Sequence, residues 1–583
     1  MSKILRVNMT DLTAKFENVP EKYKFLGGRG LTSAITCDEV PPTCHPLGPN
    51  NKISFAPGIV TGSGAPTAGR LSVGCKSPLT GGIKEANAGG IAADKLARLG
   101  VKAIVVEGQP KEKGKFWMLR VNKDGAELSP AAAEWIGKGL YATYPKMLKK
   151  FGEKTGIISI GPAGEMLMAM AGICVNDPEN RPSRYAGRGG VGAVMGSKGL
   201  KAIIVDEQGG PGVSITNNEA FNSGRKKLTD ALRQHDITKP GGTLNTYGTA
   251  ALVNVINEAG AFPTRNFSTG RFEGAAKISG EMINETCKKR GGVGQTGHRG
   301  CTGCIIQCSN VYPKEDGTEL VSCQEYESVW SLGADCGIDN LDVTGELIRL
   351  CNDYGLDTIE AGTTLAVAME AGLAKFGDGK KAIELMHEIG KGTPLGHILG
   401  GGTALTADTF GVVRCPTVKR QSMPAYEPRA IKGIGVTYAT SNMGADHTSG
   451  YTIAPEILGV SGKMDPASKG VEKAEASRNF QYATAFIDSS GHCLFIAFAI
   501  LDIPSGMEGM VEECNGVLGT NWTVNDIGRI GGDIVKRERA FNEAAGFTKF
   551  DDRVPEFMKY EKLPPHNVVY DVPDEVLDKV HNP

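Results

Sequence analysis

Short runs of β-branched and other apolar residues, each followed closely by Gly, Pro or Asp, recur along the N-terminal third of the chain. They are KILRVNM (3–9), KISFAPG (52–58), RLSVGCK (70–76), KAIVVEG (102–108), FWMLRVN (116–122), TGIISIGP (155–162) and KAIIVDE (201–207). Runs of this length and composition are typical of β-strands. Helical patterns interrupt them, so we predict a mixed domain that is rich in strands.

The spacing of apolar residues changes from about residue 209 onward. They now recur at positions i, i+3 and i+4, often with a glycine near the end of the pattern, in residues 218–235, 342–355, 358–376 and 380–392. This periodicity predicts amphipathic helices. An irregular stretch with several prolines, CPTVKRQSMPAYEPRA (415–430), separates them from a third segment that is again mainly helical.

These patterns predict an α+β protein with three domains. A strand-rich N-terminal domain (1–208) is followed by two mainly helical domains, 209–413 and 414–583. The length of 583 residues supports this division, because single cores stop growing near roughly 250–300 residues.

The charge balance gives no sign of a nucleic acid or membrane partner. Lys and Arg together number 64, and Asp and Glu number 65. No run approaches the roughly 18 apolar residues of a spanning helix, and the opening MSKILRVNMTDL lacks the hydrophobic segment of a signal peptide. We therefore expect a cytoplasmic protein.

Glycine is abundant, with 79 residues, and it gathers in loops such as GSGAPTAGR (62–70), NAGG (87–90) and GRGGVG (187–192). Loops of this kind bring backbone N–H groups close to a ligand, often an anion. GRGGVG also satisfies the dinucleotide pattern G-x-G-x-x-G. We reject a dinucleotide site, because polar residues rather than a strand are expected before it and Asp206 follows too early.

Three of the 14 cysteines lie close together in HRGCTGCIIQC (298–308), at a C-x2-C-x3-C spacing. Cys301, Cys304 and Cys308 suit an iron–sulfur cluster, whereas structural zinc needs a second pair that is absent here. The radical enzymes that cleave S-adenosylmethionine use the reverse spacing, C-x3-C-x2-C, before an alternating strand–helix barrel. We therefore expect a closed cluster with four protein ligands, and spacing alone does not select the fourth among the eleven other cysteines.

Four longer motifs carry a resemblance to a known family. At KSPLTGGIKEANAGG (76–90), GRGGVGAVMGSKGLKAI (187–203), QEYESVWSLGA (324–334) and FIDSSGHCLF (486–495), the sequence resembles the tungsten-containing aldehyde:ferredoxin oxidoreductases, which carry a bis-molybdopterin cofactor. The match runs in order from near the N-terminus to beyond residue 530. The N-terminal domain would then form the base for the cofactor.

The resemblance implies the activity as well. It implies tungsten-dependent oxidation of aldehydes to carboxylic acids, with electrons leaving through a 4Fe-4S cluster to ferredoxin or to a dedicated iron–sulfur subunit, and the reverse reaction with a strong reductant. One alternative is the catalytic subunit of an aromatic acyl-CoA (benzoyl-CoA-type) reductase, and another is a non-catalytic iron–sulfur electron-transfer subunit. Glu327 and His447 both match family residues beside the metal, and their joint presence favours aldehyde oxidation.

By the same resemblance, Cys493 is the fourth cluster ligand. Asp488 matches the pterin-binding motif D-x-x-G-L-C, with His492 in place of Leu. The companion motif D-x-x-G-L-D corresponds to NDYGLD (352–357), where Asn352 replaces the first Asp and Asp353 stands beside it. Read without the family, this stretch is a helix that ends at Gly355 and a second helix capped by Asp357.

The family also implies contacts from the glycine-rich loops. Arg70 matches an arginine between cluster and pterin, Arg184 and Arg188 suit the pterin phosphates, and the backbone carbonyls of Asn87 and Tyr185 match ligands of a bridging Mg²⁺. The full set of expected cofactor-binding residues is Arg70, Asn87, Arg184, Tyr185, Ala186, Gly187, Arg188, Gly189, Gly190, Asn352, Gly355, Leu356, Asp357, Asp488 and His492. No protein thiolate is implied for tungsten itself.

Glu327 and His447 match family residues beside the metal. A carboxylate there can move a proton, and an imidazole can hydrogen-bond the aldehyde oxygen; Glu325 competes locally with Glu327. Some relatives join two subunits through an iron held by an E-x-x-H motif. This chain has Glu346 and Arg349 at that spacing, so we expect no such iron and no dimer joined in that way. An oligomer that includes a separate iron–sulfur subunit is a reasonable substitute for the dimer.

Overall fold

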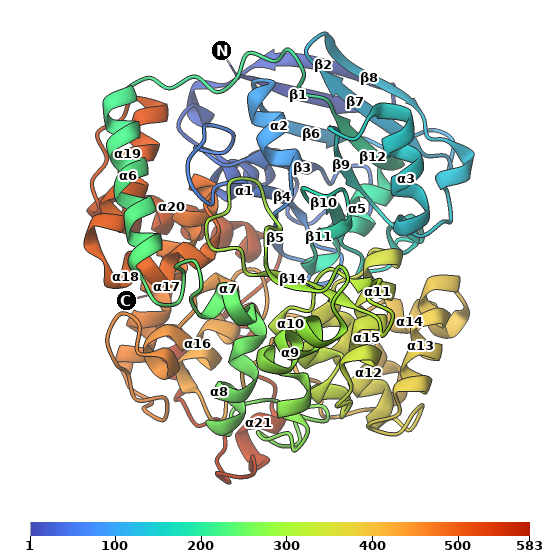
Figure 1. Ribbon diagram of the computed structural model, residues 1–583, viewed down its shortest axis with the longest axis vertical. Coiled ribbons are helices and arrows are strands. Elements are labelled where there is room, and N and C mark those ends of the chain that lie inside the picture. Colours follow the sequence, from blue (N-terminus) through green and yellow to red (C-terminus); the bar gives the residue numbers. More distant parts are fainter. Residues whose placement is uncertain (1, 583) are drawn as a thin grey trace.

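The computed structural model describes residues 2–582, and the first third of the chain folds into two six-stranded sheets (Figure 1). The first sheet contains β1 (Lys3–Asn8), β2 (Thr13–Asn18), β3 (Ile53–Pro57), β4 (Leu71–Lys76), β5 (Ile83–Ala88) and β6 (Val101–Glu107). The second contains β7 (Trp117–Asn122), β8 (Gly125–Pro130), β9 (Gly156–Ser159), β10 (Ile173–Asn176), β11 (Pro182–Ala186) and β12 (Leu200–Val205). All seven predicted strands are confirmed.

The two sheets repeat one topology. Their strand orders are β2-β1-β6-β3-β4-β5 and β8-β7-β12-β9-β10-β11. In each sheet only one pair is parallel, β1 with β6 and β7 with β12. Helices α2 (Ala92–Arg98) and α5 (Val191–Ser197) follow the edge strands β5 and β11 in the same way, and these two edge strands contact each other. Buried residues of both sheets, including Phe55 and Ile158, share one core.

One expectation about this region is wrong. The polar residues before the GRGGVG loop form a strand, β11, because Pro182–Ala186 pairs antiparallel with β10. The rejection of a dinucleotide site rested partly on the absence of that strand. The alternating antiparallel order from β11 to β12 nevertheless differs from the parallel strand–helix–strand unit that such sites use.

The rest of the chain is mainly helical, as predicted. Its middle part contains α6 (Asn218–Gln234), α7 (Thr243–Tyr247), α8 (Leu252–Glu258), α9 (Gly280–Arg290), α10 (Tyr326–Ser331), α11 (Leu341–Tyr354), α12 (Thr358–Glu370), α13 (Gly379–Lys391), α14 (Pro394–Gly400) and α15 (Thr403–Phe410). Three short strands, β13 (Gln295–His298), β14 (Ser309–Pro313) and β15 (Glu319–Val321), flank the cysteine-rich loop. Each of the four predicted helices is therefore present.

A final group of helices completes the molecule: α16 (Lys432–Thr440), α17 (Val471–Ser490), α18 (Ala497–Asp502), α19 (Pro504–Leu518), α20 (Asn525–Ala544), α21 (Phe557–Tyr560) and α22 (Asp574–Asp578). Helix α6 lies beside α19 at the edge of the molecule (Figure 1). In the described part of the chain, no helix is both long enough and apolar enough to cross a bilayer.

The C-terminal end of α17 is set deep against the N-terminal sheets. Backbone hydrogen bonds join Ile59 N to Ser489 O and Val60 N to Ser490 O, at 3.1 and 2.9 Å. Gly58 permits this approach, because a Cβ on it would lie 2.0 Å from the Cα of Gly491. The motif that ends α17 is therefore fixed in space by the first domain.

Candidate active site

A cavity of about 630 Å³ lies where the sheets meet the two helical parts. Residues from the β4–β5 region, from β11, from α10 to α12, from the segment around residue 447 and from the end of α17 all line it. These segments are far apart in the sequence. The fold thus gathers the predicted motifs around one cavity.

All four predicted cluster cysteines line this cavity. Cys301, Cys304 and Cys308 lie on the loop between β13 and β14, and Cys493 follows the end of α17. Burial and the neighbouring Cys301 thiol raise the pKa of Cys304 to about 12, and burial with Glu325 and the nearby thiols raises the pKa of Cys308. The four thiols are therefore close enough to interact.

The four cysteines form a donor set that suits an iron–sulfur cluster. Among residues 2–582, no three His, Cys, Asp or Glu side chains converge on a point where a single metal ion could bind. A 4Fe-4S cluster differs because each thiolate binds its own iron, so the four sulfurs surround it at a distance from one another. The donor set, four cysteines facing one cavity, fits that group.

Arg70 lies between the thiols and Asn87. Its Nε donates to Asn87 Oδ1 at 2.6 Å, and its Nη1 lies 4.0 Å from the sulfur of Cys301. Burial lowers the pKa of Arg70, but the neighbouring thiolates of Cys493 and Cys301 outweigh this effect and raise it. Within the described residues no carboxylate forms an ion pair with Arg70, so its charge is available to an anionic ligand.

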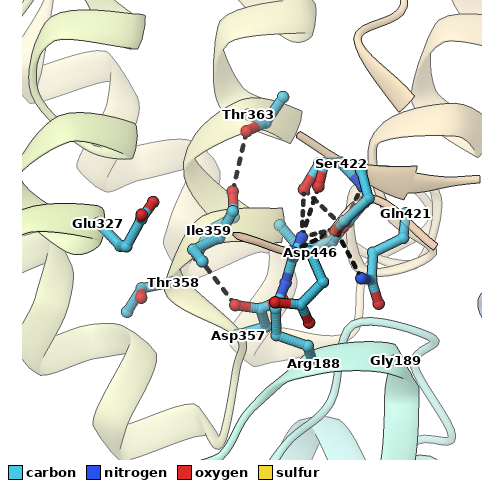
Figure 2. A network of polar contacts seen from close by, with 12 residues as sticks. Arg188, Gly189, Glu327, Asp357, Thr358, Ile359, Thr363, Gln421, Ser422 and Asp446 are labelled. Atoms are coloured by element: carbon cyan, nitrogen blue, oxygen red, sulfur yellow. Dashed lines mark hydrogen bonds and ion pairs between the residues drawn. The ribbon is translucent and has the colours of Figure 1, made fainter. Parts of the chain in front are cut away.

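Arg188 is held by a dense network at the end of β11 (Figure 2). Its Nε donates to Asp357 Oδ2 at 3.2 Å, Nη1 donates to Ala445 O at 2.7 Å, and Nη2 donates to Ser422 O at 2.6 Å. Gly189 and Gly190, which follow it, have φ values of 79° and 75° that other residues rarely adopt. These contacts fix the loop and aim Arg188 along the cavity wall.

Arg184 also faces the cavity, from the strand β11. Its Nη2 donates to Ser309 Oγ at 2.5 Å, and Nη1 lies 3.6 Å from Glu325. Its buried Nε has no hydrogen-bond partner. Of the predicted loop residues, Tyr185 and Gly187 line the cavity, whereas Ala186, Gly189 and Gly190 do not.

The NDYGLD motif separates its two candidate side chains. Asn352 lines the cavity, and its Nδ2 reaches Ser322 O and Tyr141 Oη only at 3.5 Å. Asp353 turns the other way and accepts a hydrogen bond from Tyr141 N at 2.9 Å, outside the cavity. The geometry therefore favours Asn352 as the residue that would meet a ligand.

The same motif joins two helices as predicted. Gly355 ends α11 in the left-handed region, with φ 80°, and Asp357 caps α12 by accepting from Ile359 N at 3.0 Å. Leu356 and Asp357 line the cavity, and Gly355 does not. Asp357 thus both caps a helix and binds Arg188.

Asp488 and His492 differ in position. Asp488 lines the cavity, and burial with the adjacent Glu85, opposed by Arg29, raises its pKa to about 8. His492 is fully buried outside the cavity, where Nε2 lies 2.8 Å from Glu513 Oε2 and Nδ1 lies 2.9 Å from Ser490 Oγ. His492 therefore supports the segment that carries Asp488 and Cys493 without facing the ligand space.

Glu327 and His447 meet in the cavity although 120 residues separate them. Glu327 Oε1 lies 3.3 Å from His447 Nε2, without hydrogen-bond alignment, and Glu327 Oε2 accepts from Ala425 N at 3.0 Å. Oε1 of Glu327 and Nδ1 of His447 are buried without hydrogen-bond partners. Both atoms are therefore free to contact a substrate.

Burial shifts these two groups in opposite senses. It raises the pKa of Glu327 to about 8 and lowers the pKa of His447 to about 4, although the Asp446 carboxylate favours the charged imidazole. At neutral pH the carboxyl is mostly protonated and the imidazole is neutral. Glu325, the competitor, bonds Thr249 Oγ1 at 2.6 Å and faces Arg184 instead of His447.

Several lining residues were not identified from the sequence. Lys84 and Glu85 precede Asn87 in a quoted motif, and Asp446 precedes His447, so adjacency was the available signal. Lys84 Nζ lies 3.5 Å from Asp446 Oδ2. Arg349, which replaces the histidine of the iron motif, lies over the Tyr141 ring at 3.7 Å and donates to Leu320 O at 3.1 Å.

The comparisons with known proteins agree with the motifs. Residues 4–207 match the family model of the aldehyde ferredoxin oxidoreductase N-terminal domain, and residues 224–581 match the model of its domains 2 and 3. The chain is 38% identical to the tungsten-containing aldehyde ferredoxin oxidoreductase of Pyrococcus horikoshii and 39% identical to that of Pyrococcus furiosus. Both alignments cover 96% of this chain and 92% of the relative.

Two more distant proteins are similar over nearly the whole chain. The WOR-like subunit of an aliphatic sulfonate oxidoreductase from Pyrococcus furiosus is 26% identical, over 96% of this chain and 90% of that protein. The active site complex BamBC of benzoyl coenzyme A reductase, solved with 1,5 dienoyl-CoA, superposes with a TM-score of 0.79 at 19% identity. It covers 99% of this chain and 93% of that one, which shows a shared fold.

Proposed function

Because this chain belongs to the aldehyde ferredoxin oxidoreductase family, we propose that it oxidises aldehydes to carboxylic acids with a tungsten bis-molybdopterin cofactor in the large cavity. The observation that carries the proposal is the convergence on one cavity of four thiols, several buried cations and the Glu327–His447 pair. The likeness to the benzoyl coenzyme A reductase complex adds only a fold.

The thiols of Cys301, Cys304, Cys308 and Cys493 would hold a 4Fe-4S cluster. Arg70 supports this assignment, because a buried guanidinium without a carboxylate partner balances negative charge on thiolates and pterin. Its second contact, with Asn87, links the thiols to the β5 edge strand.

The duplicated sheets would each support one pterin. Asn87 on β5 and Tyr185 on β11 occupy matching edge strands that contact each other, and their backbone carbonyls would hold a Mg²⁺ that neutralises phosphate charge. Arg184 and Arg188 supply positive charge beside the glycine-rich loop. Asn352, Asp357 and Asp488 offer polar atoms to the pterin rings.

When bound, the tungsten cofactor supplies the two-electron redox chemistry. The residues of this chain would orient the aldehyde and move protons. His447 can donate a hydrogen bond to the carbonyl oxygen as negative charge develops there. Glu327, whose pKa is raised to about 8, can accept through Oε1 the proton that leaves as the carbon is oxidised, when the carboxyl is in its ionised form.

The balance of the reaction requires an electron acceptor. An aldehyde and water give a carboxylic acid, two protons and two electrons. When bound, the 4Fe-4S cluster would supply one-electron transfer, and we propose ferredoxin or a dedicated iron–sulfur subunit as the acceptor, with a strong reductant reversing the reaction. Assembly into an oligomer stays a prediction.

Metal analysis of anaerobically purified protein tests the proposal. We expect about one tungsten, about two pterins and about four irons per chain, with aldehyde-dependent reduction of ferredoxin. Cys493→Ala should lose iron. Cys415→Ala, which removes a half-buried thiol outside the cavity, is the matched control and should retain the full content.

Iron without tungsten or pterin in the wild type would contradict the catalytic proposal and indicate an electron-transfer subunit. Full metal content with no turnover of any aldehyde would contradict the substrate assignment alone. Equal iron loss in Cys493→Ala and Cys415→Ala would point to general instability instead of ligation.

A further inference from the structure

Part of the cavity lining is apolar, and we call this part the apolar compartment. Its residues come from segments 237–255, 451–458 and 494–510, and they include Leu252, Tyr451, Leu458, Phe495, Phe498 and Leu501. No lining residue from these three segments is charged, although the compartment adjoins the thiols of Cys304 and Cys308. At the outer end Val255 is 46% exposed, so the compartment reaches the surface beside α8.

This distribution restricts the part of the substrate that extends away from the reacting carbonyl. A charged or strongly hydrated tail would lose its water in the compartment without gaining a countercharge, which is unfavourable. An uncharged apolar tail would gain from burial there. An aldehyde held by Glu327 and His447 therefore fits best when the rest of the molecule is apolar.

An aromatic group connects the Glu327–His447 pair to this compartment. Rings of His447 and Tyr451 lie 6.2 Å apart, and Tyr451 and Phe498 also lie 6.2 Å apart in an edge-to-face arrangement of 86°. Phe498 in turn stacks on Phe495 at 6.1 Å. Aromatic side chains thus follow one another from the reacting centre into the apolar compartment.

Tyr451 is the best fixed of these rings that face the cavity. Its hydroxyl bonds the Tyr426 hydroxyl at 2.8 Å, and the two rings meet edge to face at 5.7 Å. Tyr426 is itself almost completely buried and packs against Tyr326 at 5.5 Å. A ring held by Tyr426, His447 and Phe498 loses little freedom when a ligand packs on it, so it can discriminate by shape.

We propose that Tyr451 is a specificity-determining residue that selects aldehydes with an aromatic ring over saturated aldehydes of the same size. The inference rests on the proposed aldehyde oxidation. With the carbonyl beside Glu327 and His447, an aromatic substituent would extend toward the Tyr451 ring, which lies 6.2 Å from the His447 ring. Offset or edge-to-face contact between two rings is favourable beyond simple burial, and a saturated ring gains only the burial.

Benzaldehyde and cyclohexanecarbaldehyde test the proposal, because they share a carbon skeleton and differ in the aromaticity of the ring. For wild type and Tyr451→Leu we would measure kcat and KM on both aldehydes. We expect kcat/KM for benzaldehyde to fall by about tenfold in Tyr451→Leu, mainly through KM, and to change less than about threefold for cyclohexanecarbaldehyde. Tyr451→Phe should keep the wild-type preference, because the ring remains.

Inhibition constants for benzoate and cyclohexanecarboxylate give a readout that does not depend on turnover of the aldehyde under study. In Tyr451→Leu, inhibition by benzoate should weaken, and inhibition by cyclohexanecarboxylate should not. Tyr560→Leu, at a residue that is 60% exposed and outside the cavity, is the control variant. If Tyr451→Leu fails to load tungsten and iron, Tyr451→Met provides the same comparison with a flexible apolar side chain.

Equal losses on both aldehydes, or an unchanged ratio, would overturn the role of Tyr451 while leaving aldehyde oxidation intact. Loss of the preference in Tyr451→Phe would assign selectivity to the hydroxyl and would also overturn the proposal. A loaded wild type that oxidises neither aldehyde nor any other would contradict the proposed function itself.

Discussion

Glu327 offers a pH-dependent test at the scale of one residue. Its pKa is raised to about 8 by burial, and the base form is the one that can accept a proton. We expect kcat/KM to rise with pH and to level off above about 8. Glu327→Gln should lower kcat by about 10²-fold or more and abolish this dependence. A wild-type rate that is flat between pH 6 and 9 would contradict the role.

The Glu327 carboxyl should also make folding stability depend on pH. Stability should fall as pH rises, whereas kcat/KM should rise. Between its ordinary pKa of 4.5 and the raised value, the folded protein holds a proton that the unfolded chain has released. Folding stability therefore falls as pH rises through this window, by on the order of 5 kcal/mol for cofactor-depleted protein. Glu327→Gln should flatten the curve measured by denaturant unfolding, and Glu258→Gln, at an exposed carboxyl, should not. Parallel curves of stability against pH for wild type and Glu327→Gln would refute the raised pKa of Glu327.

His492 shows how a departure from the family motif is compensated within this chain. Its imidazole Nε2 lies 2.8 Å from Oε2 of the fully buried Glu513, and Glu513 Oε1 has no hydrogen-bond partner among residues 2–582. His492→Leu restores the family residue but leaves a buried carboxyl unpaired, so we expect a loss of about 1–3 kcal/mol. The double variant His492→Leu/Glu513→Leu should recover part of the lost stability. Additive losses in a double-mutant cycle would show that the pair is not coupled.

At the scale of elements, the position of α17 depends on glycines that contact it. A Cβ on Gly58 would lie 2.0 Å from the backbone of Gly491, which must move α17's end and with it Asp488 and Cys493. We expect Gly58→Ala to lower the unfolding temperature and the iron content together. Gly528→Ala in α20 is the control, because nothing lies within 4 Å of its Cβ position and alanine favours a helix. Normal iron in Gly58→Ala would show that the site tolerates the shift.

The elements differ in how far the sequence predicts them. Strands such as Ile53–Pro57 and Leu200–Val205 are predictable because each is a mainly apolar run, interrupted only by Ser54 and Lys201 respectively. β11 is not predicted because Ser183, Arg184 and Tyr185 line the cavity and are only half-buried, so no apolar run marks them. The duplicated sheet topology was not predicted either, because strand pairing depends on contacts between distant segments.

The residues of the candidate site are also predictable only in part from the sequence. Spacing indicated three cluster cysteines, and Cys493 came only from the family resemblance, since it lies in an apolar stretch that also suits a core thiol. Lys84, Asp446 and Tyr451 line the cavity without any distinctive pattern of their own. Their proximity arises from tertiary packing, which one sequence does not encode in a local signal.

At the scale of the whole molecule, the cavity joins all three sequence regions and contains charge that the protein alone balances poorly. Arg70 has no carboxylate partner among the described residues, Arg184 Nε has no acceptor, and Glu327 and Asp488 are raised in pKa. An anionic cofactor would balance the positive charge of Arg70 and Arg184 and would bind only the folded state. The three regions should therefore be held together more firmly when the cofactor is present.

Protein from cultures without tungstate should accordingly unfold at a temperature several degrees lower than protein from tungstate-supplemented cultures, as measured by calorimetry. Iron content, measured on the same samples, separates the contribution of the cluster from that of the tungsten cofactor. Arg70→Ala should reduce the difference in unfolding temperature between the two preparations, because it removes the cation that the bound anionic cofactor would stabilise. Equal unfolding temperatures at equal iron content would mean that the protein charges are satisfied without the cofactor, by water or by protonation, and that the three regions are held together by their cores alone.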